Sequence, residues 1–164
     1  MVGKRIVVDE RMQSRMARGM DIAGRRLADI RVGDELPPLS RTVTRVTIFM
    51  FGVAYWSTHR LHYDVEYARA AGFSDVLVTA NLLSAYNAEL VTRWTAPAAT
   101  LRSLEERNVA SAVAGDTVVA RGRVSALEPG AGGGLVWCDL EMSTQSGIRV
   151  TQGRASVFVP DGMP

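Results

Sequence analysis

The chain has 164 residues, of which 47% are hydrophobic and 22% charged, and its formal net charge is +2. This length suits one domain that can bury a hydrophobic core. The ordinary composition and small net charge give no reason to expect a nucleic acid as partner, and no apolar run reaches the ~18 residues that cross a membrane.

Residues 1–31 predict a basic arm ahead of a single domain that spans 32–164. Arginines outnumber acidic residues in this arm, but no aromatic residue lies between the charges to stack on bases. We therefore expect the arm to be solvated, or to pack on the body or on a partner subunit. The charges also interrupt its short apolar run, so a signal peptide is not expected and the predicted location is cytoplasmic.

The single cysteine, Cys138, cannot form an internal disulfide. It lies in a predicted strand, where a buried and unreactive thiol is expected.

The first half of the predicted domain contains one strand and two helices. Residues 32–39 carry Gly33 and two prolines, which break regular structure, and the alternation over 41–46 predicts a strand. A helix over 47–56 follows, with Thr44 or Thr47 as its cap. This helix is apolar on most faces, which suits an interior or an interface. A short helix over 64–71 ends at Gly72, and 73–78 is a connector.

The clearest helix spans 79–94, with Thr79 or Asn81 as its cap. Apolar residues recur there at helical spacing, and Pro97 ends the run. The remainder is strand-like: 100–113 alternates weakly, 117–127 and 135–145 are joined by a flexible glycine-rich loop, and 148–159 is the last strand. The order predicts an α+β domain, in which an antiparallel sheet of about five or six strands wraps around the 79–94 helix.

The segment 56–64, WSTHRLHYD, contains both histidines of the chain, His59 and His62, followed by Asp64. Histidine titrates near neutrality and suits proton transfer. Two imidazoles and a carboxylate are also metal ligands, but no fourth ligand is evident. We therefore expect neither a metal nor a cofactor.

With its flanking helices, this segment resembles the active-site motif of the MaoC-like hot-dog-fold acyl-thioester hydratases and dehydratases, D-x-N-P-x-H-x-D. The form HRLHYD is most similar to the branch with mesaconyl- and itaconyl-CoA hydratases and hydroxyacyl-thioester dehydratases. His62 and Asp64 match the motif, whereas Ser57 replaces its first aspartate, His59 its asparagine and Arg60 its proline.

The resemblance implies an enzyme that adds water to, or removes it from, a thioester of CoA or an acyl carrier protein. It makes His62 the general acid/base, with His59 or Asp64 orienting it and Ser57 holding a water. The family's His-Gly or Gln-Gly pair corresponds to Thr79 and Ala80, so the N–H of Ala80 is the expected donor to the enolate oxygen.

Most of these residues have a structural alternative. His59 is expected to make a structural hydrogen bond, Asp64 to cap the 64–71 helix as readily as to act in chemistry, and Ala80 to permit close packing. Arg60 can bind an anionic group of the substrate or form a salt bridge. The remaining substrate-binding candidates are Asn81, beside the helix start, and the aromatic residues Tyr55 and Trp56, which equally suit a core.

Three function classes remain open at this point. The first is the hydratase or dehydratase, acting as a homodimer or a larger even oligomer. The second is a non-catalytic subunit of a heteromeric hydratase, which the replacement at Ser57 favours. The third is a hot-dog thioesterase or an acyl-CoA-binding protein.

Overall fold

The computed structural model describes residues 25–95 and 99–161. The predicted basic arm therefore lies largely outside the described residues. In chain order the elements are η1 Leu27–Asp29, β1 Glu35–Thr42, α2 Arg45–Tyr55, η2 Arg60–His62, α3 Val65–Ala70, α4 Ala80–Thr95, β2 Thr100–Asn108, β3 Thr117–Gly130, β4 Gly133–Thr144 and β5 Arg149–Pro160. No helix in the described ranges is long and apolar enough to cross a membrane.

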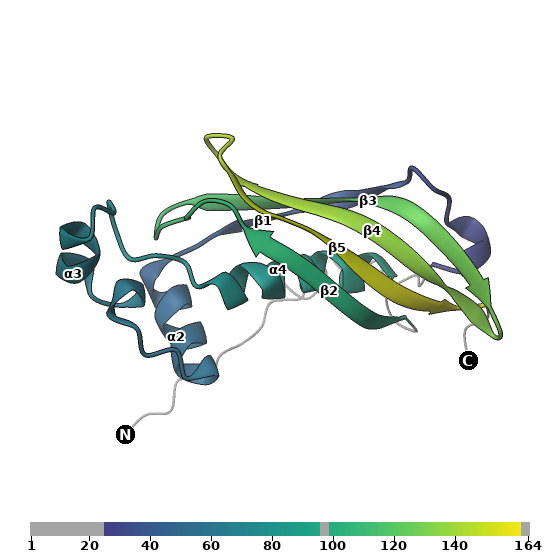
Figure 1. The fold of residues 1–164 in the computed structure, drawn as a ribbon, viewed down its shortest axis with the longest axis horizontal. Helices are drawn as coiled ribbons and strands as arrows, with labels where there is room; N and C mark the ends of the chain where they lie inside the picture. The colour runs from purple at the N-terminus through teal and green to yellow at the C-terminus, as the bar shows by residue number, and fades with distance from the viewer. Residues whose placement is uncertain (1–24, 96–98, 162–164) are drawn as a thin grey trace, which may run out of the picture.

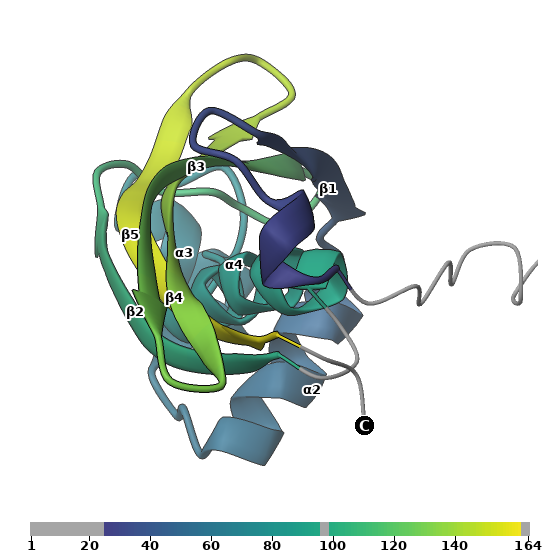
Figure 2. The same cartoon turned by 90° about the vertical axis from the view of Figure 1, so that its right-hand side faces the viewer.

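Five antiparallel strands form one sheet in the order β1-β3-β4-β5-β2. The sheet curves around α4, which contacts every strand (Figures 1 and 2). The apolar stripe predicted for this helix is the face that it buries, with Leu82, Leu83, Leu90, Val91 and Trp94 all inside the core. The predicted α+β fold with a sheet wrapped around one long helix is confirmed.

The first strand differs from the prediction. β1 runs through the two prolines, Pro37 and Pro38, and has ended before Arg45 begins α2. Proline is tolerated because β1 is an edge strand that needs hydrogen bonds on one side only. The pairing with β3 shifts between Leu36 and Leu39, so the prolines lie where the ladder is interrupted. The predicted strand over 41–46 was therefore wrong for most of its length.

The glycine-rich loop between β3 and β4 is also shorter than predicted. Pairing continues to Gly130 opposite Gly133, which leaves two residues in the turn. A Cβ atom on Gly133 would lie 2.3 Å from the carbonyl oxygen of Val159 in β5. This glycine therefore allows close approach of neighbouring strands, and the expectation of a flexible loop was wrong for most of that segment.

The other strands agree more closely with their predictions. β2 covers 100–108 of the weakly alternating segment, and it lies at the second edge of the sheet, where polar residues on both faces are tolerated. The turns at Gly115 and Gly147 both use a positive φ angle. Cys138 is fully buried in β4, as expected, and burial raises the pKa of its thiol to about 12.

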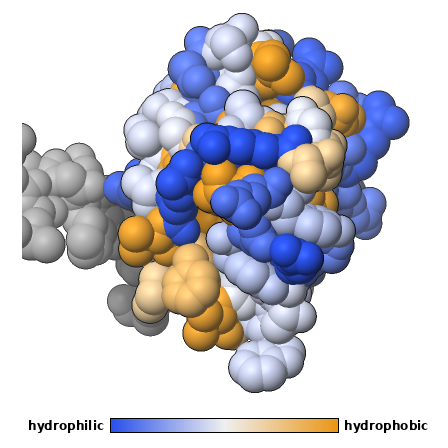
Figure 3. Space-filling view, turned by 90° about the vertical axis from the view of Figure 1, so that its left-hand side faces the viewer, coloured by the Kyte–Doolittle hydropathy of each residue, from blue (hydrophilic) through white to orange (hydrophobic). Residues whose placement is uncertain are grey.

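Helices α2 and α3 lie at one end of the sheet (Figure 1). The Thr44 side chain caps α2 by accepting a hydrogen bond from the Thr47 N–H at 3.0 Å. Ile48 and Gly52 face inward, but most of this apolar helix faces solvent. Figure 3 shows hydrophobic residues gathered at this end of the molecule. We call the exposed face the α2 stripe; its members are Val46, Phe49, Met50, Val53 and Trp56.

Candidate active site

His62 is the last residue of η2, and it is half-buried. Its Nδ1 lies 3.0 Å from the carbonyl oxygen of Leu77, and the Leu77 N–H donates to the carbonyl oxygen of Leu61 at 2.9 Å. Because a carbonyl oxygen can only accept, Nδ1 must carry the hydrogen. The neutral ring therefore presents the lone pair of Nε2, and no group in the described residues hydrogen-bonds to that atom. This is the form of histidine that can take a proton.

His59 has a structural role in this conformation. Its Nδ1 accepts a hydrogen bond from the Leu61 N–H at 3.3 Å, which caps η2. The rings of His59 and His62 lie edge to face with their centres 6.1 Å apart, too far for a direct hydrogen bond. Leu77, which the sequence analysis did not single out, orients His62 instead.

Asp64 caps α3, because its Oδ1 accepts from the Tyr67 N–H at 3.0 Å. Its Oδ2 accepts from Arg60 at 2.7 Å, and the guanidinium of Arg60 also lies over the Tyr67 ring. The backbone N–H of Tyr67 and the guanidinium hold the pKa of Asp64 below its usual value. Asp64 thus makes the capping interaction and Arg60 a salt bridge, and neither hydrogen-bonds to His62.

Ser57, Trp56 and Tyr55 lie where α2 ends. Trp56 has φ 57° and ψ 37°, the left-handed conformation that usually closes a helix with glycine. Ser57, which is half-buried, donates its N–H to Gly52 O at 2.8 Å. Tyr55 stacks on Phe51 but is 60% exposed, and Trp56 is 82% exposed. The alternative that Tyr55 and Trp56 fill the hydrophobic core of the chain is therefore wrong.

The start of α4 is linked to His62 through Leu77, which lies shortly before the helix in the chain. Thr79 is buried and caps the helix by accepting from the Leu82 N–H at 3.3 Å, whereas Ala80 and Asn81 are exposed. Ala80 is the third residue after Leu77, so their Cα atoms are at most about 11 Å apart. The first N–H groups of a helix have no intrahelical acceptor and lie at the positive end of its dipole. The hydrogen bond from His62 to Leu77 therefore joins the imidazole to the segment that leads into this helix end.

The described residues contain no group of three or more histidine, cysteine, aspartate or glutamate side chains placed to hold a metal ion. The carboxylate at Asp64 and the two imidazoles point to different partners, as the hydrogen bonds above describe.

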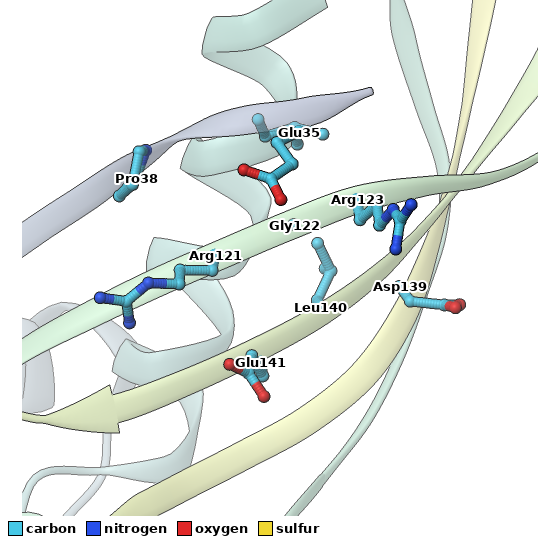
Figure 4. Close-up of a pocket in the computed structure, with 9 residues that line it drawn as sticks. Glu35, Pro38, Arg121, Gly122, Arg123, Asp139, Leu140 and Glu141 are labelled. Carbon is cyan, nitrogen blue, oxygen red and sulfur yellow. The ribbon is translucent and has the colours of Figure 1, made fainter. Parts of the chain in front are cut away.

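A depression of about 360 Å³ lies elsewhere, on the outer face of the sheet over β1, β3 and β4 (Figure 4). Its charges alternate across the strands, since Glu35 pairs with Arg123 and Arg123 with Asp139. Opposite charges on neighbouring strands stabilise a solvated sheet face. The depression includes no residue of the 56–64 segment, and we assign it no part in the site.

A helix wrapped by an antiparallel sheet is the hot-dog fold, and in this chain the histidine-bearing segment comes before that helix. A family model of the FAS1-like dehydratase domain region matches residues 30–152, and the chain belongs to this family. The resemblance drawn from HRLHYD to the MaoC-like hydratases and dehydratases is thereby confirmed.

Solved structures with the same fold agree. The R-hydratase PhaJ1 from Pseudomonas aeruginosa has a TM-score of 0.75 at 18% identity, covering 84% of this chain and 86% of that one. A MaoC-like dehydratase from Rhodospirillum rubrum has a TM-score of 0.74 at 22% identity, covering 86% and 100%. The ChsH1-ChsH2 complex from Mycobacterium tuberculosis has a TM-score of 0.72 at 24% identity, covering 79% and 98%. No curated protein sequence matches the chain.

Proposed function

We propose that the protein hydrates an enoyl thioester, or dehydrates the corresponding 3-hydroxyacyl thioester, with His62 as the general acid/base. The observation that carries this proposal is the fixed tautomer of His62, which leaves Nε2 available for a proton. Membership of a dehydratase family supports the reaction class.

In the hydration direction, Nε2 of His62 accepts a proton from water while the water oxygen bonds to the β-carbon of the enoyl group. The electron pair of the double bond moves to the thioester oxygen as an enolate, and the imidazolium then returns a proton to the α-carbon. The N–H of Ala80 is the proposed donor to the enolate oxygen, because it lies at the positive end of α4. The hydroxyl of Ser57 orients the water, since it cannot act as a base at neutral pH.

The proposed substrate is a thioester of CoA or of an acyl carrier protein, and the proposed location is the cytoplasm. The side chains assigned here need no cofactor for this reaction, because an imidazole supplies both proton transfers. Tyr55, Trp56, Arg60 and Asn81 stay as candidates for contact with the substrate around His62.

We further propose that the protein assembles as a homodimer or a larger even oligomer through the α2 stripe. Its members follow the spacing i, i+3, i+4, i+7 and i+10, which is the spacing of a helix that docks with one face. Their exposures range from 53% for Phe49 to 82% for Trp56. A stable interface buries about 800 Å² on each partner, and five large apolar side chains supply much of that area.

A second candidate is a subunit of a heteromeric hydratase. The two-component ChsH1-ChsH2 complex among the similar structures favours it, as does Ser57 in the place of the motif's aspartate. In that case the α2 stripe contacts a different hot-dog chain, and the purified single chain has little activity.

The test is turnover of an acyl-CoA panel by the purified chain, followed by the gain or loss of water in the product mass. His62→Ala should lower kcat/KM by about 10²-fold or more, because positioned acid–base catalysis contributes ~10²–10⁴-fold. His59→Ala should cost less in rate and more in stability, since it removes the cap of η2. Ser57→Asp restores the motif's carboxylate and should raise activity.

Near-full turnover by His62→Ala would refute the mechanism. Release of free CoA instead of hydration would identify a thioesterase. Activity that appears only when a second chain is added would select the heteromeric alternative.

A further inference from the structure

Glu106, on the helix-facing side of β2, is a half-buried carboxylate that hydrogen-bonds only to neutral groups among the residues that the structure describes. It accepts hydrogen bonds from the Ser84 hydroxyl and from Nδ2 of Asn87, the latter at 2.7 Å. Elsewhere in the described chain, half-buried carboxylates such as Glu89 and Asp75 are paired with arginine. No ion pair within the described residues neutralises Glu106, so its remaining lone pairs stay free to accept a further donor.

Asn87 is fully buried, and its amide oxygen has no hydrogen-bond partner in the described chain. Both hydrogens of its Nδ2 are used, one by Glu106 and one by Thr151 at 3.1 Å, so the amide orientation is fixed. Leaving such an acceptor unsatisfied is unfavourable, because the oxygen has lost its hydrogen bonds to water and gained none in the fold. Because the two heteroatoms of an amide share one carbon, Asn87 Oδ1 lies within about 5 Å of Glu106 Oε2, close enough for one bound group to reach both.

A glycine in β5, the strand beside Glu106, lets the two strands lie close together at this point. Gly153 of β5 pairs with Glu106, and a Cβ atom at Gly153 would lie 2.3 Å from the Glu105 carbonyl oxygen and 2.6 Å from Glu106 Cβ. Thr151, two residues earlier, is fully buried, and its hydroxyl accepts from Asn87, so its own hydrogen remains for an acceptor. The cluster of Ser84, Asn87, Glu106 and Thr151 thus offers two open acceptors and one open donor.

The cluster lies along α4 from the candidate active site. Ala80, Ser84 and Asn87 are spaced i, i+4 and i+7, so they share one face of the helix. At a rise of 1.5 Å per residue, Ser84 and Asn87 lie about 6 and 10 Å along the axis from Ala80. An acyl chain of medium length covers this distance from a thioester carbonyl at the Ala80 N–H, and it must pass between α4 and the sheet, because Asn87 is fully buried.

We infer that the cluster binds a hydroxyl group carried by the acyl chain of the substrate, an inference that rests on the proposed function. A hydroxyl donates to one of the open acceptors and accepts from Thr151. An ammonium group has no lone pair for the Thr151 hydrogen, and a carboxylate is repelled by Glu106. A plain alkyl chain leaves all three groups without partners, and sites of this kind reject analogues that lack the polar group.

The experiment compares oct-2-enoyl-CoA with 8-hydroxyoct-2-enoyl-CoA as substrates of the full chain. The hydroxylated thioester should have a kcat/KM at least about tenfold higher. Glu106→Gln should reduce that preference to less than about threefold, since an amide cannot accept from both Ser84 and Asn87 and also bind the hydroxyl. Glu105→Gln, on the opposite face of the same strand, is the matched control and should keep the preference. If Glu106→Gln does not fold, Ser84→Ala, which removes one group that holds the carboxylate, should lower the same preference, and an unchanged preference would contradict the inference.

A binding measurement separates this inference from the proposed function. Calorimetry with the His62→Ala chain compares octanoyl-CoA and 8-hydroxyoctanoyl-CoA, neither of which can be hydrated. Tighter binding of the hydroxylated thioester supports the inference even when turnover is absent. Equal binding of both overturns the inference alone, because a fixed water then satisfies the cluster. Failure of both to bind overturns the proposed function as well.

Discussion

Replacing Trp56 with glycine should change the stability of the monomer and the strength of assembly in opposite directions. Trp56 holds φ 57° and ψ 37° while its N–H donates to Gly52 and Val53 carbonyl oxygens at the end of α2. A side chain in this conformation costs about 1–2 kcal/mol, whereas glycine adopts it freely.

The expected gain is smaller than this strain, because glycine also increases the freedom of the unfolded chain, which costs about 0.5–1 kcal/mol. Trp56→Gly should therefore raise the free energy of unfolding of the monomer by about 0.5–1 kcal/mol, or roughly 1–4 °C in Tm for a chain of this size. The indole is 82% exposed, so little packing is lost within the chain.

Assembly should respond in the opposite way. A tryptophan buried in an interface commonly contributes about 2 kcal/mol or more, so Trp56→Gly should weaken self-association by roughly 30-fold. Sedimentation equilibrium over a concentration series measures association, and urea unfolding of dilute protein measures the monomer. Trp56→Ala is the matched control, since it removes the indole and keeps the strained conformation.

Two results would refute this reasoning. Unchanged association of Trp56→Gly would exclude the end of α2 from the interface. A monomer that is less stable than the wild type, while Trp56→Ala is not, would show that the left-handed conformation is not a source of strain.

Three further predictions concern stability and reactivity. Arg45 lowers the pKa of Asp75 from 3.8 to about 2, so this pair should stabilise the fold above pH ~4 and lose its contribution as the pH falls toward 2. In urea unfolding over a pH series, Asp75→Asn should therefore reduce the dependence of the free energy of unfolding on pH in this range. Cys138 should resist a thiol reagent at pH 8 until the chain unfolds, because burial raises its thiol pKa to about 12; rapid labelling of folded protein would contradict this. Gly153→Ala should destabilise the fold by about 1–3 kcal/mol, since its Cβ would meet backbone at 2.3 Å, and an unchanged Tm would show that β2 shifts freely.

Local signals in the sequence predicted much of the scaffold. The helical spacing of leucines over 79–94 located α4, and short polar side chains marked helix starts at Thr44, Asp64 and Thr79. These predictions succeeded because a cap or an apolar face depends on residues within one or two turns of each other. Glycines at 72, 115 and 147 likewise ended elements where a positive φ is required.

The tertiary structure decided features that depend on distant neighbours. Proline favoured a loop at 37–38, but the edge position of β1 permits a strand there. The apolar helix predicted over 47–56 was compatible with a core, but only Ile48 and Gly52 of α2 are buried in the folded chain.

For the candidate site, the match of HRLHYD to the family motif predicted His62 as the acid/base, and this stays a prediction. The sequence did not determine what holds that ring, because any backbone carbonyl can accept from an imidazole and only the folded path brings Leu77 to it. The cluster at Glu106 was missed for the same reason: Ser84, Asn87 and Thr151 are ordinary helix and strand residues until α4 packs against the sheet. Short sequence patterns determine the interactions between residues that are close together in the chain. Contacts between residues tens of positions apart depend instead on how the apolar faces of the helices and the sheet bury one another.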